Sequence, residues 1–409
     1  MDATFSKEIK AMSARLAFAH PGFRRYFIGA VAGVNGNWIF RVLLSWLAWD
    51  ETGSASFVGL VAAASLAPVA VTSPFFGALT DRVPILTIYR IVSAGLLVCP
   101  AALFVLMFAG GLAPLPILGI ALLFGMVISA YHPVRQSLGP RLVDPPLIGS
   151  VVALAALNFN VGRIISPAIG GAMIAGLGTL PTAVISTALF LPNLIIAPTL
   201  SPRNVEENGP RKSYLADLGE GLRAGWARWP VRRALILTVV ALGPVRAVGE
   251  ILALIADGRF AQGAQGLGLL TSAVGAGALL AAVFQVIAGA RLLRLPALRF
   301  GVIAMGFAAT AGLTLAPDFW VALALAPLTG FAGTYVGVSL QIGIQARLED
   351  HLRGRIMSLW MVAITLSTSA LAFLVSALSE VFGLAATTLA MLGVAALAVI
   401  WLALNPPGD

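Results

Sequence analysis

Long apolar blocks alternate with short polar segments along the whole chain, and each block is long enough to cross a lipid bilayer. A spanning helix needs about 20 apolar residues, because the hydrocarbon core is about 30 Å thick and a helix rises about 1.5 Å per residue. The blocks lack the alternation of apolar and polar residues that marks a membrane barrel. The pattern predicts twelve transmembrane helices, at residues 26–49, 56–79, 85–108, 114–132, 148–176, 180–198, 234–256, 266–289, 297–315, 319–340, 355–379 and 383–404.

The composition is that of a polytopic, all-α membrane protein. Of the 409 residues, 59% are hydrophobic and 11% are charged, and the mean hydropathy is +0.95. Soluble domains carry about 25% charged residues, so the charge here is too sparse to cover a water-facing surface. The single cysteine, Cys99, lies in an apolar block. It therefore supports neither a disulfide framework nor a thiolate metal site.

Basic residues gather on one side of the predicted membrane. With both termini placed in the cytoplasm, the cytoplasmic segments hold 21 of the 26 lysines and arginines, and the outer loops hold only Arg259. Such an excess of basic residues in cytoplasmic loops sets the orientation of membrane helices. The net charge of +9 therefore reflects topology, and nucleic acid is excluded as a partner. We expect a multi-pass protein of the inner (plasma) membrane with both termini in the cytoplasm.

A polar central segment divides the predicted helices into two groups of six. We expect an N-terminal bundle at 1–198, a cytoplasmic linker at 199–233 and a C-terminal bundle at 234–409. The chain begins with an amphipathic stretch, and apolar residues recur at helical spacing within the linker. Both patterns are typical of amphipathic helices that lie on a membrane surface.

The two halves also carry matching motifs. The run "RLVD" at 141–144 returns as "RLED" at 347–350, and "GALTDR" from Gly77 has a counterpart in "GARLLR" from Gly289. Each pair falls in corresponding cytoplasmic loops of the two halves. A repeat of this kind predicts two pseudo-symmetric bundles with parallel topology.

Several of these motifs are similar to those of the major facilitator superfamily. The run "GALTDRV" at 77–83 resembles the superfamily's loop signature. The runs "HPGFRRYF" at 20–27, "GRIISPAIGG" at 162–171 and "RLEDHLRGRIMS" at 347–358 resemble its drug and siderophore efflux branch, which includes the enterobactin exporter and macrolide efflux proteins. The resemblance covers nearly the whole chain. It implies the twelve-helix major facilitator fold and secondary active transport by alternating access.

The sequence departs from that branch at two places. After the Asp81-Arg82 pair the chain continues with apolar residues up to Arg90, where the superfamily signature normally has further basic residues. Many branch members also carry an aspartate in the first helix where this chain has Asn37. If that acid carries protons in the relatives, a different residue must do so here.

Charged residues and a glycine in the cytoplasmic loops form a predicted latch. The resemblance implies that they clasp the two halves together in the outward-facing state. These latch residues are Gly77, Asp81, Arg82, Arg135, Arg141, Arg347, Arg353 and Arg355.

Four charged residues fall deep inside predicted helices. Counting about 1.5 Å per residue from the inner end, Arg41 and Arg163 lie roughly 22 Å deep, and Arg246 and Glu250 roughly 18 and 24 Å deep. Each charge costs roughly 2.5–3.5 kcal/mol in the bilayer, so such residues usually face a partner or a wet cavity. We therefore predict one substrate-binding layer. Its members are Arg41, Asn37, Arg163, Arg246, Asn160 and Gln341. For Arg163, a role in helix packing or gating is the alternative.

Glu250 is the only carboxylate well inside any predicted helix. Because arginine does not release its proton, Glu250 is the candidate proton carrier by elimination. Arg246 lies one helical turn before it and is its predicted partner. The alternative is that these two residues simply neutralise each other at i, i+4 spacing.

No pattern for catalysis or for metal or nucleotide binding stands out. The histidines His20, His132 and His351 are far apart, and no phosphate-binding glycine loop is present. We expect no enzyme activity, no cofactor and no metal site. The expected partners are a small-molecule substrate, protons and the lipid bilayer, and the protein is expected to act as a monomer.

The favoured function is a proton-coupled exporter of a small amphipathic compound. The excess of three arginines over one glutamate in the predicted layer favours an anionic, siderophore-like substrate. Two alternatives stay open. One is uptake of an organic anion, or flipping of a lysophospholipid, by the same fold. The other is a non-transporting membrane scaffold or sensor.

Overall fold

The computed structural model describes residues 16–79, 83–203, 229–293, 295–346, 348 and 350–405. Every regular element in these ranges is a helix. The amphipathic N-terminal stretch and the linker helix that the sequence predicts fall almost entirely outside the described residues. The fold class agrees with the sequence prediction.

Six long helices form the N-terminal half. They are α2 (Pro21–Asp50), α3 (Ala55–Leu79), α4 (Ile85–Phe108), α5 (Pro114–Leu138), α6 (Ile148–Leu177) and α7 (Thr179–Ile196), with short 3-10 turns η1 (Gly139–Leu142), η2 (Pro145–Leu147) and η3 (Ala197–Thr199). Proline stands in the first turn of α2 and α5, where its missing amide hydrogen has no helical partner to lose. Gly178 separates α6 from α7 with a φ of 93°, a value that favours glycine.

The C-terminal half contains five long helices and one interrupted crossing. The elements are α9 (Trp229–Leu237), η4 (Thr238–Leu242), α10 (Gly243–Glu250), α11 (Leu252–Ala256), α12 (Gly263–Leu293), α13 (Pro296–Leu315), α14 (Phe319–Gln345), α15 (Asp350–Phe382) and α16 (Leu384–Leu404). In the described residues, eleven helices are long and apolar enough to cross a membrane. The remaining predicted crossing, at 234–256, is present as the consecutive segments α9, η4, α10 and α11.

The interruption of this seventh crossing has a local cause. Pro244 cannot donate a backbone hydrogen bond, and its ring excludes the carbonyl of Val240 four residues earlier. Val240 lies in η4, a π-helical segment that absorbs the misfit. A second break follows at Ile251, whose φ of −114° and ψ of 27° are not helical. Glu250 is therefore the last residue of α10, and the backbone around it is discontinuous.

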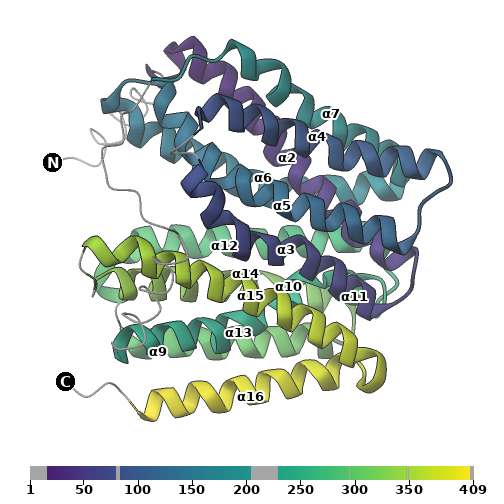
Figure 1. Ribbon diagram of the computed structural model, residues 1–409. Coiled ribbons are helices and arrows are strands. Elements are labelled where there is room, and N and C mark those ends of the chain that lie inside the picture. Colours follow the sequence, from purple (N-terminus) through teal and green to yellow (C-terminus); the bar gives the residue numbers. More distant parts are fainter. Residues whose placement is uncertain are drawn as a thin grey trace.

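The two halves lie side by side (Figure 1). Helices α2–α7 form one bundle and α9–α16 the other, and the start of α2 and the end of α16 lie at the same end of the molecule. Contacts between the halves run mainly along α3 with α15 and along α6 with α12. Glycines permit the second of these approaches, since a Cβ on Gly268 would lie only 3.0 Å from the Cα of Gly171.

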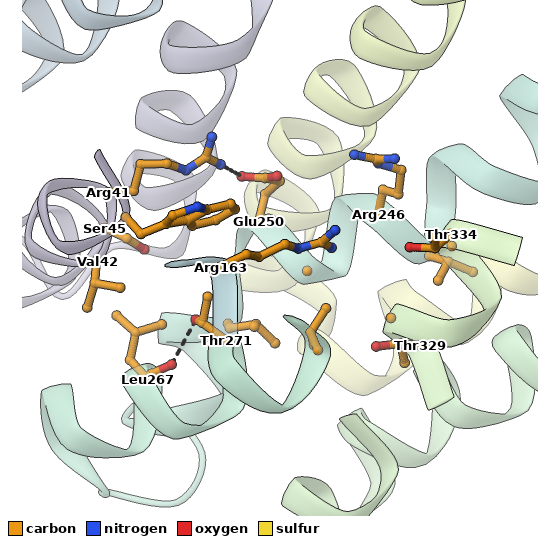
Figure 2. A pocket seen from close by; sticks show the side chains of 17 residues that line it. Arg41, Val42, Ser45, Arg163, Arg246, Glu250, Leu267, Thr271, Thr329 and Thr334 are labelled. Carbon is orange, nitrogen blue, oxygen red and sulfur yellow. Dashed lines mark hydrogen bonds and ion pairs between the residues drawn. The ribbon is translucent and has the colours of Figure 1, made fainter. Parts of the chain in front are cut away.

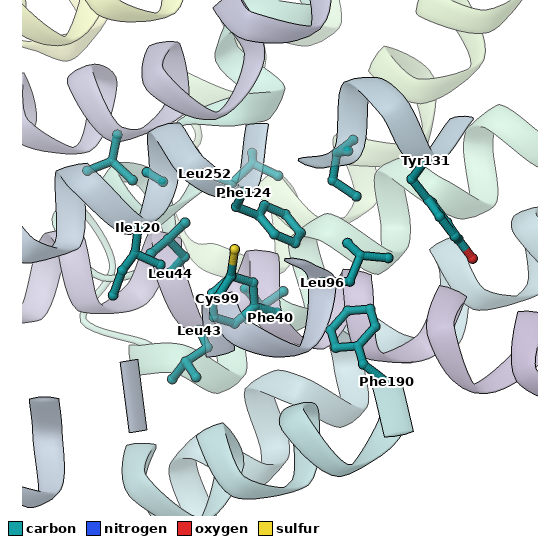
Figure 3. Close-up of a cluster of buried hydrophobic side chains, with 14 of the residues drawn as sticks. Phe40, Leu43, Leu44, Leu96, Cys99, Ile120, Phe124, Tyr131, Phe190 and Leu252 are labelled. Carbon is teal, nitrogen blue, oxygen red and sulfur yellow. The ribbon is translucent and has the colours of Figure 1, made fainter. Parts of the chain in front are cut away.

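A cluster of large buried side chains fixes α2 within the N-terminal half (Figure 3). Phe40 on α2 packs edge-on against Phe124 on α5, with ring centroids 4.9 Å apart, and Leu96 and Phe190 complete the cluster from α4 and α7. Cys99 lies in this cluster and is fully buried. The neighbouring residue Arg41 is thus carried on a helix that is rigidly held.

Hydrogen bonds join the halves at the end opposite the start of α2. The Trp49 Nε1–H donates to Asp257 Oδ2 at 2.8 Å. Glu380 Oε1 accepts from the Ser54 hydroxyl at 2.6 Å and from the Ser56 backbone N–H at 2.9 Å. In this conformation the two halves are therefore held together at that end.

Candidate functional site

The four intramembrane charges surround one pocket between the halves (Figure 2). Arg41 comes from α2, Arg163 from α6, and Arg246 and Glu250 from α10. Threonines on α12 and α14 complete the wall; these are Thr271, Thr329 and Thr334. The structure brings together the charged layer that counting along the helices predicts.

Arg163 reaches this pocket through a close approach of two helices. A Cβ added to Gly275 on α12 would lie 2.7 Å from the carbonyl oxygen of Arg163 and 3.4 Å from its Cγ. A larger residue would push α12 away from α6 at this point. Gly275 therefore lets α12 pass directly over Arg163 and form the pocket wall.

An ion pair crosses the pocket from one half to the other. Arg41 Nη2 donates to Glu250 Oε2 at 2.6 Å, and the two side chains are 29% and 24% exposed. The sequence-based prediction that Arg246 is the partner of Glu250 is therefore wrong for this conformation. The physical reason is that α10 ends at Glu250 and the segment after the break, α11, contacts α2, so the end of α10 lies within reach of Arg41.

The Arg41 guanidinium also lies over an aromatic ring. Its Cζ is 5.3 Å from the centre of the Trp38 ring, a distance typical of a cation–π interaction. Trp38 lies three residues before Arg41, so both side chains project from the same face of α2. Trp38 was not among the residues predicted from the sequence, although its i, i+3 spacing from Arg41 could have indicated a shared helix face.

Two arginines in the pocket have no protein partner. Neither Arg163 nor Arg246 makes a hydrogen bond or an ion pair with another residue in the described part of the chain. Arg246 is solvent-accessible although its neighbours Val245 and Ala247 are buried, because it faces the pocket. With three arginines and one glutamate, the pocket has a formal charge of +2. The pocket suits an anion, since one guanidinium group can donate two parallel hydrogen bonds to the oxygens of a carboxylate or phosphate.

The pocket is small in this conformation. Its volume is about 120 Å³, whereas sites for drug-sized ligands usually measure about 300–1,000 Å³. The space admits a small anion or the charged group of a larger compound. A whole drug-sized substrate would require the halves to separate around the Arg41–Glu250 ion pair.

The uncharged members of the predicted layer do not join this pocket. Asn160 lines a different cavity, between α2, α5 and α6, where its Nδ2 donates to the Ala156 carbonyl at 2.9 Å. Asn37 and Gln341 line neither of these two cavities. Asn37 and Asn160 lie one turn before Arg41 and Arg163 on the same helices, so one turn in height is enough to place a side chain outside this pocket.

Most of the predicted latch is outside the described residues. Asp81, Arg82 and Arg347 belong to undescribed positions, and the side chains at Gly77, Arg353 and Arg355 are likewise not described. Arg141 lies in η1, where its carbonyl accepts a hydrogen bond from the Arg203 N–H at 2.9 Å. The latch therefore stays a prediction.

Known proteins resemble this chain over most of its length. A family described as transmembrane secretion effectors matches residues 12–407. The chain is 26% identical over 379 residues to the multidrug efflux pump Tap of Mycolicibacterium fortuitum, which covers 89% of this chain and 90% of that protein. It is 29% identical over 141 residues to the staphyloferrin A transporter of Staphylococcus aureus, which covers 34% of this chain and 36% of that protein.

Solved transporter structures share the fold. The nucleoside transporter NupG matches with a TM-score of 0.69 at 13% identity, covering 93% of this chain and 98% of that one. A bacterial homologue of the iron transporter ferroportin, in an inward-facing state, matches with a TM-score of 0.65 at 18% identity, covering 94% and 98%. At these identities the likeness concerns the fold alone. The family match covers nearly the whole chain, and the fold agrees with it. The protein therefore belongs to the transmembrane secretion effector family of the major facilitator superfamily, and it is a multi-pass membrane transporter rather than an enzyme.

Proposed function

We propose that this transporter is a proton-coupled exporter of a small amphipathic anion and that it works by alternating access. One observation carries the proposal: among the described residues, the pocket between the halves has two guanidinium groups with no hydrogen bond or ion pair and a single carboxylate, Glu250, which is bonded to the opposite half through Arg41. The two relatives, a multidrug efflux pump and a staphyloferrin A transporter, support the export of small compounds.

Either of two ligands would break the Arg41–Glu250 ion pair. A proton on Glu250 removes the negative charge, while Arg41 stays charged because a guanidinium does not deprotonate. An anionic substrate would instead take the place of Glu250 on Arg41. The displaced carboxylate then has Arg246 one helical turn away as an alternative partner.

In this arrangement, the transporter that has bound neither substrate nor proton is held in one conformation. With neither ligand bound, the ion pair holds α2 and α10 together across the two halves. Loading with a substrate or with a proton releases the halves, so each ligand shifts the same conformational equilibrium. Exit of one substrate would then alternate with entry of a proton.

The membrane orientation is part of the proposal. The distribution of basic residues supports cytoplasmic termini in the inner membrane. The end at which Trp49 bonds to Asp257 then faces outward. The conformation described here would be closed to the outside, and we propose that a monomer is the transporting unit.

Transport into inverted membrane vesicles tests this function. Vesicles with an acidic interior would be supplied in turn with a catecholate siderophore, a macrolide and a lysophospholipid. We expect accumulation of the anionic siderophore inside the vesicles, abolished by a protonophore and absent from vesicles without the protein. Movement of the lysophospholipid alone, or loss of preloaded siderophore from the vesicles, would instead support the flipping or uptake alternatives.

A further inference from the structure

A second cavity, which the mechanism above does not use, lies between α2, α5 and α6 near the start of α2. Its volume is about 470 Å³, which falls within the usual range of about 300–1,000 Å³ for small-molecule sites. The arginine pocket measures about 120 Å³. Of these two cavities, the second is therefore the one that has room for the body of a drug-sized compound in this conformation.

One side of this cavity is apolar and aromatic. Phe23 and Phe27 contribute from α2, with ring centroids 5.8 Å apart, and Phe159 contributes from α6. Val151 and Val152 extend the apolar wall along α6. Such a surface suits a planar ring or an acyl chain.

The other side carries polar groups without protein partners. The Arg135 guanidinium lies 5.4 Å from the Phe159 ring centre and 5.9 Å from that of Tyr131, and it makes no hydrogen bond or ion pair with a described residue. Asn158 is only 8% exposed, and its side-chain amide has no partner among the described residues. Asn158 lines the cavity, so its unbonded amide is available to hydrogen-bond a ligand or ordered water there.

The charged residues that line the cavity favour an anionic ligand. Among the described residues that line it, Arg135 is the one arginine or lysine, His132 is beside it, and none is an aspartate or glutamate. The aromatic rings hold the guanidinium at the cavity wall, where a cation without an acidic neighbour attracts an anion.

We propose that this cavity is a separate binding site for an anionic amphiphile. Arg135 binds the anionic group, Asn158 donates a hydrogen bond to it, and the apolar body packs against the phenylalanines. The site lies nearer the start of α2 and adjoins the arginine pocket, because Phe159 in its wall and Trp38 in the wall of the arginine pocket have ring centroids 6.0 Å apart. It is therefore placed to hold a compound before that compound reaches the arginine pocket.

Calorimetry with 2-naphthalenesulfonate as the probe tests the site on purified full-length protein in a neutral detergent. All measurements would use an Arg246→Ala background, which weakens the arginine pocket and so separates this site from the proposed transport site. We expect saturable binding in that background. Arg135→Gln should raise the dissociation constant about tenfold or more, because a charge-assisted contact is lost. Arg90→Gln removes the same charge from an exposed position on α4 outside both cavities and should have no effect.

A second variant tests the cavity without altering charge. Ala155 lines it, so Ala155→Phe should fill the space and weaken binding to a similar degree. An unchanged dissociation constant in both Arg135→Gln and Ala155→Phe would overturn the proposed site. The proposed transport function is tested separately, by the vesicle assay.

A competition experiment distinguishes an anionic lipid from a water-soluble amphiphile as the natural ligand. Phosphatidylglycerol and phosphatidylcholine would be added separately to the probe-bound protein. If only phosphatidylglycerol displaces the probe, and only while Arg135 is present, the site holds an anionic lipid headgroup. If neither lipid displaces a probe that still depends on Arg135, the site serves a water-soluble amphiphile.

Discussion

Arg41 and Glu250 lie 209 positions apart in the chain and form a 2.6 Å ion pair that joins α2 to the end of α10. Of the ion pairs between described residues, it is the one that links the two halves. Its carboxylate can gain a proton and its guanidinium cannot lose one. Breaking this contact is therefore the simplest way in which a proton could alter how the halves move.

Glu250→Gln is expected to abolish substrate accumulation against a gradient while substrate affinity is retained or rises by up to about fivefold, which corresponds to about 1 kcal/mol, because an anion no longer has to displace a charged carboxylate from Arg41. Glutamine keeps the size and hydrogen-bonding capacity of the side chain but cannot titrate. The measurements are vesicle accumulation under a pH gradient and equilibrium binding to purified protein.

Glu51→Gln is the matched control, because Glu51 is exposed at the end of α2 and outside the arginine pocket. If the Glu250→Gln variant still accumulates substrate, Glu250 serves only to neutralise the arginines of the pocket. Coupling would then have to involve Asp50 or Asp257, or an ion other than the proton.

A double-mutant cycle of Arg41→Gln and Glu250→Gln should give a coupling free energy of about 1 kcal/mol. The value is small for an intramembrane pair because both side chains are partly exposed to the pocket, 29% and 24%, and solvent screens such pairs. Each single variant should lower the unfolding temperature in detergent, and the double variant should lower it by less than the sum. Strictly additive shifts would show that the pair contributes nothing to stability.

Arg246→Ala is expected to weaken binding of an anionic substrate about tenfold or more and to slow transport accordingly. Arg246 makes no hydrogen bond or ion pair with a described residue, so loss of the cation should act on the ligand and leave folding largely intact. Arg246→Lys should recover only part of the affinity, since an ammonium does not bind an anion in the paired geometry of a guanidinium. Arg90→Ala serves as the control. Equal affinity in wild type and Arg246→Ala would remove Arg246 from the binding site.

Gly277→Ala should destabilise the C-terminal half by about 1–3 kcal/mol. A Cβ at this position on α12 would collide with the backbone carbonyl of Pro327 on α14, and a backbone atom cannot rotate aside. Gly301 on α13 has nothing within 4 Å of its Cβ position, so Gly301→Ala should be neutral or slightly stabilising. Thermal unfolding of the two variants in the same detergent measures the difference. Equal unfolding temperatures would show that α12 and α14 can separate without loss of stability.

Cysteine labelling from outside intact cells should modify Gly111→Cys and spare Asn405→Cys. Gly111 lies in the exposed turn between α4 and α5, and Asn405 follows α16 at the opposite end of the bundle. The native Cys99 is fully buried and should add little background. Labelling of Asn405→Cys and not Gly111→Cys would invert the proposed orientation.

The positions of the membrane helices could be predicted from the sequence alone. The stretch 85–108, for example, is both predicted and observed as a single helix, α4. Each crossing must satisfy its own backbone hydrogen bonds within the hydrocarbon, so length and apolarity suffice to define it. The depth of Arg41, Arg163, Arg246 and Glu250 followed in the same way, since a helix rises by a constant amount per residue.

Tertiary packing decided which of these groups meet. Local spacing favoured Arg246 as the partner of Glu250, but the break at Ile251 and the contact of α11 with α2 place Arg41 there instead. Asn160 lies one turn before Arg163 on α6 and lines a different cavity, because the helices packed around α6 enclose a separate space at that height. A single helix determines the height of each side chain in the membrane. Its rotation and its neighbours are set by contacts between helices, such as that of Gly275 with Arg163, which join residues more than a hundred positions apart.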